Sequence, residues 1–182
     1  LQRLPAALAE GHNNSVRLDT PVEEIRREGE GEGGAGSERF RLETADGIER
    51  VDRLVVTTPA DVTADLLGGL PEFCTDSGDA LRELNYNPQV LVHLHSEADL
   101  AGAGYQVQYD EAFDTRGVTW NASLLDRDGV YTCYLGGSEN PDAVEWSDDE
   151  LESVASAEFE EITGHSARAL AVHRLERGMP AY

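Results

Sequence analysis

The sequence predicts an α+β protein, in which a hairpin and a strand–helix unit precede a mostly antiparallel sheet flanked by helices. Residues 54–57 are a short β-branched run that leads directly into an amphipathic segment at 58–67, which is typical of a buried strand feeding a helix. Residues 147–150 form a capping box that opens a helix with one apolar face. Four short runs separated by turn residues predict the sheet: residues 89–95, 104–109, 117–122 and 130–135.

In the first part of the chain we expect a helix at residues 5–10 and strands at 15–19, 22–27, 40–44 and 50–57. The runs at 22–27 and 40–44 flank a Gly/Glu-rich loop and predict a hairpin. In the helix that follows, Thr58 is expected at the N-cap, Pro59 at the first helical position and Asp61 at the capping-box position. The helix should end before Gly68 and Gly69.

The character of the sequence changes after residue 69. We expect a helix at residues 75–84 and a second helix, with a buried face, that starts at the capping box of residues 147–150. A last strand is expected at 169–175. The apolar face of that second helix is Leu151, Val154, Ala155, Phe159 and Ile162. The change lies between Gly68 and Pro88, which divides the chain into residues 1–69 and 70–182.

The charge composition limits the classes of partner that the protein can bind. The chain has 36 acidic residues and 14 basic residues, and its net charge is −22. The 14 basic residues are all arginines. Such a surface repels nucleic acid and anionic membranes. A hydrophobic content of 40% in periodic segments argues against disorder. The excess of carboxylates therefore indicates a surface adapted to high salt, where screening suppresses self-repulsion.

The cysteines and the ends of the chain suggest its setting. Cys74 and Cys133 have no paired spacing, which favours a reduced cytoplasmic location. No segment approaches the ~20 apolar residues of a membrane span, and no signal peptide is visible. The chain starts at Leu1 rather than Met and stops within a motif, so we expect it to be a piece of a longer protein.

Two apparent ligand motifs are set aside. Residues 31–36 match the glycine pattern of dinucleotide-binding turns, but they lie between antiparallel strands, open no helix and are surrounded by glutamates that would repel a pyrophosphate. His93 and His95 share a strand face and could chelate a metal, yet no third ligand is identifiable. A half-buried strand face is the preferred interpretation of the two histidines. No residue is assigned a catalytic role.

Several motifs occur in an order that resembles the flavin-dependent amine oxidases and their relatives, the protoporphyrinogen oxidases. Each is weak alone, but together they run nearly end to end: residues 1–8, 16–25, 55–60, 84–88 and 177–182. The resemblance implies an FAD cofactor, which would do the redox chemistry while the protein orients the substrate. It also implies that residues 1–69 are part of an FAD-binding domain and that residues 70–182 form a substrate domain.

The resemblance assigns roles to individual residues. Val22 would contact the adenine through its backbone, and Thr58 and Pro59 would lie beside the cofactor. Met179, Pro180 and Tyr182 would approach the isoalloxazine. The strands of the second domain would line the substrate cavity, with the side chains of Tyr105, Val107 and Trp120 as candidates for stacking on a tetrapyrrole.

Core packing is an equal alternative for Tyr105 and Trp120. The chain also departs from the family, which usually has Trp at Leu175, Ala at Gly178 and Gln at Ala181. These departures bear on the substrate more than on the fold.

The function expected from this resemblance is oxidation of a small-molecule porphyrinogen in heme biosynthesis. Within the same superfamily, an amine oxidase or a carotenoid desaturase is the alternative. A non-enzymatic acidic binding module is the alternative from another class. The electron acceptor and the oligomeric state are left open.

Overall fold

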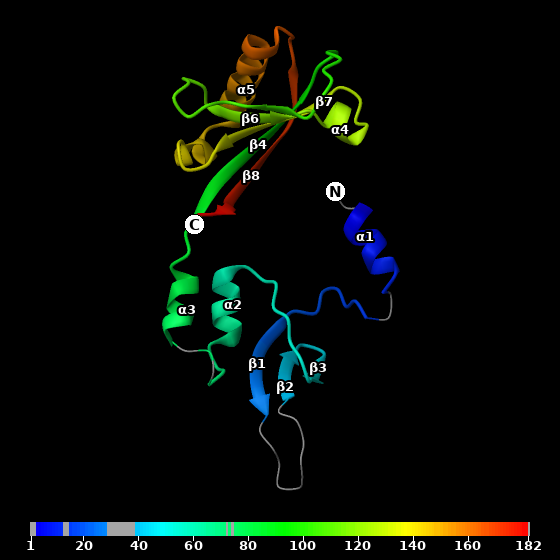
Figure 1. The fold of residues 1–182 in the computed structure, drawn as a ribbon, viewed down its shortest axis with the longest axis vertical. Coiled ribbons are helices and arrows are strands. Elements are labelled where there is room, and N and C mark those ends of the chain that lie inside the picture. The colour runs from blue at the N-terminus through cyan, green and yellow to red at the C-terminus, as the bar shows by residue number, and fades with distance from the viewer. Residues whose placement is uncertain (1–2, 13–14, 29–38, 72, 74, 182) are drawn as a thin grey trace. The chain divides into compact units, whose positions relative to one another are not determined.

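The computed structural model of the chain describes residues 3–12, 15–28, 39–71, 73 and 75–181. The chain divides into two compact units, residues 1–84 and 85–182 (Figure 1). The division falls within the 68–88 range in which the sequence changes character. The helix at 75–82 belongs to the first unit rather than the second, because it packs against the preceding helix.

The first unit contains a three-stranded antiparallel sheet in the order β1-β2-β3, together with three helices (Figure 1). Its elements are α1 (Arg3–Glu10), β1 (Val22–Glu28), β2 (Arg39–Thr44), β3 (Gly47–Val51), α2 (Ala60–Leu67) and α3 (Thr75–Arg82). The predicted hairpin is confirmed as β1 and β2. The α2 helix packs on β1 and on α3, and the buried side chains of this unit include Ile25, Ala64 and Leu70.

One predicted strand of the first unit does not form, and another is shorter than predicted, since only residues 50 and 51 of the range 50–57 lie in a strand, β3. Residues 15–19 are irregular, and the segment ends at Asp19 in a left-handed conformation with φ of 56°, which a strand cannot continue through. Residues 53–57 leave the sheet after a bend at Asp52, and no strand among the described residues pairs with them. Val55 is consequently 85% exposed, and within the described part of the chain the β-branched run belongs to no sheet.

The start of α2 also differs from the prediction. Pro59, rather than Thr58, is the N-cap, with an extended ψ of 155°. The helix therefore starts one residue later, and Asp61 misses the capping-box position. Thr58 is instead joined to Thr63, with 2.8 Å between the two hydroxyl oxygens. The predicted end of the helix, at Leu67 before Gly68, is confirmed.

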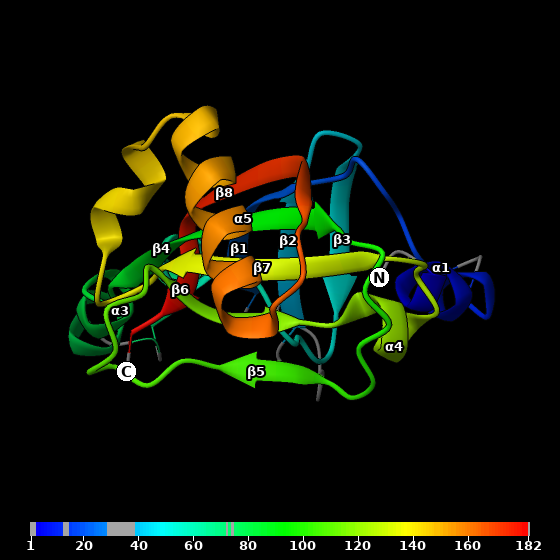
Figure 2. The same ribbon diagram turned by 90° about the horizontal axis from the view of Figure 1, so that it is seen from above.

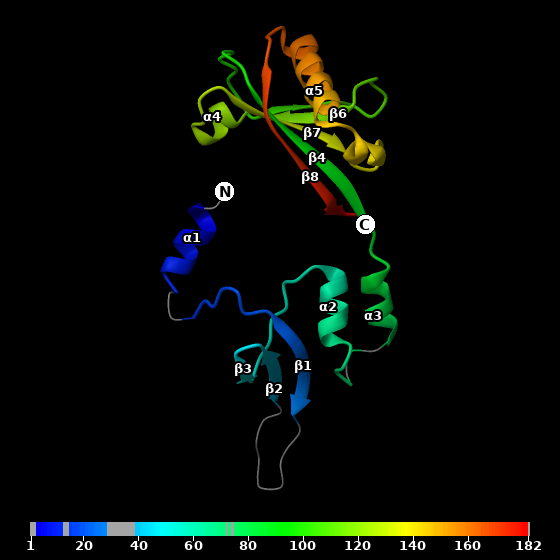
Figure 3. The same ribbon diagram turned by 180° about the vertical axis from the view of Figure 1, so that it is seen from behind.

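The second unit is a five-stranded antiparallel sheet in the order β5-β6-β7-β4-β8. Its strands are β4 (Tyr86–His95), β5 (Gly104–Gln106), β6 (Thr115–Thr119), β7 (Val130–Gly136) and β8 (Arg168–Pro180), and its helices are α4 (Asn121–Leu125), η1 (Pro141–Glu145) and α5 (Asp148–Thr163). The helix α5 crosses one face of the sheet (Figure 2). The two longest strands, β4 and β8, run side by side (Figure 3).

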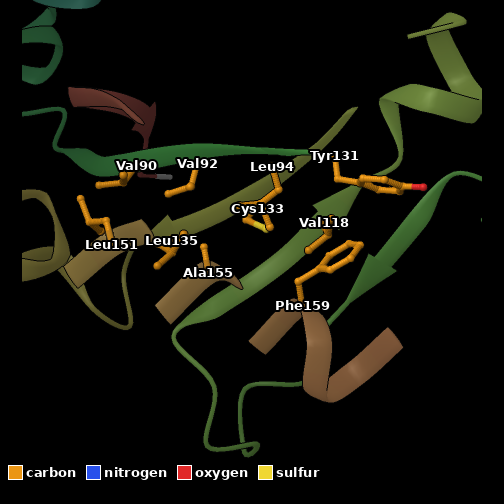
Figure 4. Packing of buried hydrophobic residues seen from close by; sticks show 10 residues of the cluster. All are labelled: Val90, Val92, Leu94, Val118, Tyr131, Cys133, Leu135, Leu151, Ala155 and Phe159. Atoms are coloured by element: carbon orange, nitrogen blue, oxygen red, sulfur yellow. The ribbon is translucent and has the colours of Figure 1, made fainter. Parts of the chain in front are cut away.

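The main core lies between α5 and this sheet (Figure 4). Alternate residues of β4 and β7 face the helix, which itself contributes Leu151, Ala155 and Phe159, all fully buried. The strand residues of this cluster are Val90, Val92, Leu94, Val118, Tyr131, Cys133 and Leu135. Ser147 accepts a hydrogen bond from the backbone N–H of Glu150, and the helix ends at Gly164. The predicted start of α5 at Ser147 is therefore confirmed, and Leu151, Val154, Ala155 and Phe159 of its predicted apolar face lie in the core or pack against it. Ile162, the last residue of that predicted face, is 38% exposed instead.

Strand lengths in the second unit differ from the predictions. The strand expected at 117–122 ends at Thr119, because Trp120 is the N-cap of the short helix α4. The strand expected at 104–109 ends at Gln106. Conversely, β8 continues past residue 175 to Pro180, since β4 starts earlier, at Tyr86, and offers it a partner. The α+β class itself is confirmed.

Candidate functional site

A cavity of about 530 Å³ lies in the second unit, where β5, β6 and β7 meet the start of β4 and the end of β8. Three of its lining residues, Gln106, Thr119 and Tyr134, belong to strand positions that alternate with the residues facing α5. The cavity therefore opens on the face of the sheet opposite α5. Its volume is in the range of small-molecule sites.

The extension of β8 brings two predicted cofactor-contacting residues to the cavity. Met179 is paired with Asn87, and Pro180 with Tyr86, and both line the cavity. Met179 is 54% exposed on β8, which is an edge strand of the sheet. This end of β8 therefore presents an apolar surface that a ligand can reach.

Gly178 explains one departure from the family pattern. A Cβ atom at this position would lie 2.8 Å from the Cβ of Gln89 on the neighbouring strand. Real Cβ atoms do not approach so closely, so the glycine permits the tight pairing of β8 with β4 beside Met179. An alanine here would require β4 and β8 to move apart.

Two of the predicted substrate-contacting residues line the same cavity. Val107 follows β5 directly, and its backbone N–H donates to the carbonyl of Arg116 at 3.1 Å. Tyr105 also lines the cavity, but it pairs with Val118 and packs against the core on the α5 side. Burial, followed by the nearby Cys133 and Glu158, raises the pKa of Tyr105. Stacking of Tyr105 on a substrate stays a prediction.

The third predicted substrate residue, Trp120, is absent from the described lining of the cavity. It packs against the core beside α4, with its ring 3.1 Å from where a Cβ of Gly102 would lie. Its Nε1 is buried and has no hydrogen-bond partner among the residues that the structure describes. The structure therefore brings Tyr105, Val107, Met179 and Pro180 together and leaves Trp120 apart from them.

The remaining predicted cofactor residues lie in the first unit, except Tyr182, which is outside the described residues. Val22 is half-buried at the start of β1, and Thr58 and Pro59 are exposed before α2. All are accessible to a ligand, so they fit flanking contacts to a flavin nucleotide. Every strand pair of the described residues is antiparallel, so none of them forms the parallel strand–glycine–helix turn that holds a pyrophosphate.

The two strand histidines have different surroundings. His93 shares a hydrogen bond with the Thr132 hydroxyl at 2.9 Å, and Asn121 donates to that same hydroxyl. Burial, and next the nearby His173, lower the pKa of His93. His95 lies near Glu97, with 3.9 Å between Nδ1 and Oε1. Among the described residues no group of three or more His, Cys, Asp or Glu side chains could hold a metal ion.

Sequence reasoning missed Arg116 and Tyr134, which both line the cavity. Tyr134 alternates with buried residues of β7 and receives a hydrogen bond from Thr119 at 3.2 Å. A signal for Arg116 was present in the sequence, because it is the only arginine between Arg82 and Arg127. Its place on the cavity, however, depends on the pairing of three strands.

The second unit is thus an antiparallel sheet with the core under α5 on one face and a cavity of about 530 Å³ on the other. The chain belongs to the flavin containing amine oxidoreductase family, whose model matches residues 1–177. Among the described residues, no helix has the length and apolar character needed to cross a membrane.

The chain is 24% identical, over 204 aligned positions, to protoporphyrinogen oxidase 1 of the chloroplast of Spinacia oleracea. The structure is also similar to that of a protein from Exiguobacterium sp. 255-15 that is provisionally assigned as a protoporphyrinogen oxidase. The similarity extends over 97% of this chain, with 26% identity and a TM-score of 0.63. Putrescine oxidase bound to putrescine has the same fold, with a TM-score of 0.66 at 13% identity over 100% of the chain. The chain spans 35% of the spinach protein and 40% of each of the two solved chains.

Proposed function

We propose that this chain is part of an FAD-dependent oxidase that acts on a porphyrinogen, and that residues 85–182 form the wall of the substrate site. The observation that carries the proposal is the cavity on the open face of the second sheet. It gathers Val107, Met179 and Pro180, which are apolar, around a space large enough for a small-molecule ligand. A wide, largely apolar ring system suits such walls.

The cofactor would be held at several places. Met179 and Pro180 would contact the isoalloxazine at the edge of the cavity, and Val22, Thr58 and Pro59 would supply flanking contacts. When bound, the flavin supplies a two-electron acceptor. The residues of this chain would orient the substrate and exclude water, since Val107, Met179 and Pro180 carry no group that could exchange a proton. The similarity to the two protoporphyrinogen oxidases supports this substrate class.

An amine oxidase is the alternative that one observation favours. Glu139 also lines the cavity and is exposed, so its carboxylate could accept an ammonium group. The fold shared with putrescine oxidase is compatible with this alternative. The two readings differ in the charge of the substrate, which makes them separable by experiment.

The test is anaerobic reduction of the flavin in the full-length protein. Addition of protoporphyrinogen should bleach the flavin absorbance, whereas putrescine should leave it unchanged. Bleaching by putrescine alone would favour the amine oxidase instead. A protein that purifies without flavin, and binds none when FAD is added, would contradict both and support a non-enzymatic binding module.

A variant localises the substrate. Val107→Asp places a charge in the apolar wall, so it should raise the KM for the porphyrinogen by about tenfold or more with unchanged flavin content. Val107→Leu is the matched control and should have little effect. An unchanged KM in Val107→Asp would remove this wall from the substrate site. The 182-residue chain alone should bind FAD weakly or not at all, and micromolar binding by calorimetry would contradict that expectation.

A further inference from the structure

Arg116 is a cation in the cavity without a carboxylate partner. Its side chain is half-buried and lines the cavity. Its Nη1 donates to the backbone carbonyl of Gln108 at 3.3 Å, and its Nε is buried with no hydrogen-bond partner in the described part of the chain. Among the described residues it forms no ion pair, although the chain has 36 acidic residues. By contrast, Arg174 contacts Asp148 at 2.6 Å.

The backbone holds Arg116 at this place. The pairing of β6 with β7 shifts register between Thr115 and Gly117, so Arg116 is the extra residue of a bulge. Bulges commonly re-aim a side chain at the rim of a site. On one side, the Glu158 carboxylate accepts the backbone N–H groups of Asp114 and Thr115, each at 2.7 Å. On the other, the carbonyl of Arg116 accepts from Val107.

A buried guanidinium N–H without a partner is unfavourable, and the planar fork of arginine matches a carboxylate with paired hydrogen bonds. Arg116 has donors to spare, because one carbonyl occupies only one of its five N–H groups. Glu139, the acidic residue in the described lining, is exposed and contacts Ser138 rather than Arg116.

We propose that Arg116 binds a carboxylate group of the substrate and thereby selects an acidic ligand over an amine. The proposal rests on the proposed function, in which the substrate is a porphyrinogen, because such a ring carries propionate side chains. Arg116 would fix one propionate at the cavity, while Val107 and Met179 contact the apolar ring. The role assigned to Arg116 is binding and orientation.

Equilibrium binding tests the proposal without turnover. The full-length protein is titrated with protoporphyrin IX and with its dimethyl ester, in the same detergent, and flavin content is measured in each variant. Arg116→Gln should weaken binding of the free acid about tenfold or more and leave ester binding unchanged, because only the free acid offers a charged acceptor. Arg116→Lys should restore part of the affinity. Arg127→Gln, at an exposed arginine outside the cavity lining, is the matched control.

The outcomes separate the two proposals. If the wild-type protein binds the free acid and Arg116→Gln binds it equally well, the role of Arg116 is overturned and the porphyrinogen proposal stands. Equal weakening toward acid and ester would also overturn it, since that pattern indicates a structural role through Gln108. A wild-type protein that binds neither porphyrin would overturn both proposals.

Discussion

The ring of His93 on β4 lies edge-on to the ring of His173 on β8, with 5.3 Å between the ring centroids. His93 also shares a hydrogen bond with the hydroxyl of Thr132. An imidazolium here would be partly desolvated and next to a second imidazole, and both effects favour the neutral form. The pKa of His93 is accordingly lowered, by burial first and then by His173.

This lowered pKa predicts an acid-sensitive stability. Protonation of His93 is easier in the unfolded chain, so the folded state should lose stability as the pH falls from about 6.5 toward the lower pKa of the folded state. His93→Gln should flatten that part of the curve of urea midpoint against pH. His12→Gln, at an exposed position, is the control. The same acid-dependent loss in wild type and His93→Gln would exclude His93 as its cause.

The Glu158 carboxylate predicts a second measurable effect. It joins α5 to the backbone next to Arg116 through the two N–H groups of Asp114 and Thr115. Glu158→Gln replaces one acceptor oxygen with an NH₂ group that faces an N–H donor, and should lower the free energy of unfolding by about 1–3 kcal/mol. Glu161→Gln, exposed on the same helix, should change it by less than about 0.5 kcal/mol. Equal effects of the two variants in urea denaturation would contradict this role.

The packing of the core predicts a third measurable effect, a loss of stability when Phe159 is truncated. Phe159 is fully buried, with its ring centroid 5.0 Å from that of Tyr131. Phe159→Ala should therefore cost about 3–5 kcal/mol of unfolding free energy. Ile162 is on the same helix but 38% exposed, and Ile162→Ala should cost less than about 1 kcal/mol. Chemical denaturation of both variants would measure the difference, and similar losses would show that Phe159 is not central to the core.

The net charge of the chain predicts a fourth measurable effect, a dependence of the Tm on salt. The 22 excess negative charges repel one another most strongly in the compact state, where they are closest. Salt at about 1 M reduces the Debye length to about 3 Å and screens this repulsion. The Tm should therefore rise from low salt to molar KCl. A flat or falling curve of Tm against KCl would contradict the salt adaptation that the sequence suggests.

The sequence by itself determined the features that depend on residues close together in the chain. Ser147 and Glu150 predict the start of α5, because an N-cap residue and the N–H group that it accepts from are three residues apart. The apolar positions of that helix identify its buried face, since helical periodicity places them together. The hairpin of β1 and β2, and the family to which the chain belongs, could also be predicted.

Only the tertiary structure decided what depends on strand partners. Residues 53–57 have a strand-like sequence, but a strand needs a neighbour to bond with, and none of the described residues provides one. Trp120 looked like a strand residue because helix α4 is too short to show a period. Arg116, Val107 and Met179 all line the cavity. Register shifts in the pairing of β6 and β8, which cannot be read from the sequence, determine which side chains of these two strands reach the same face of the sheet.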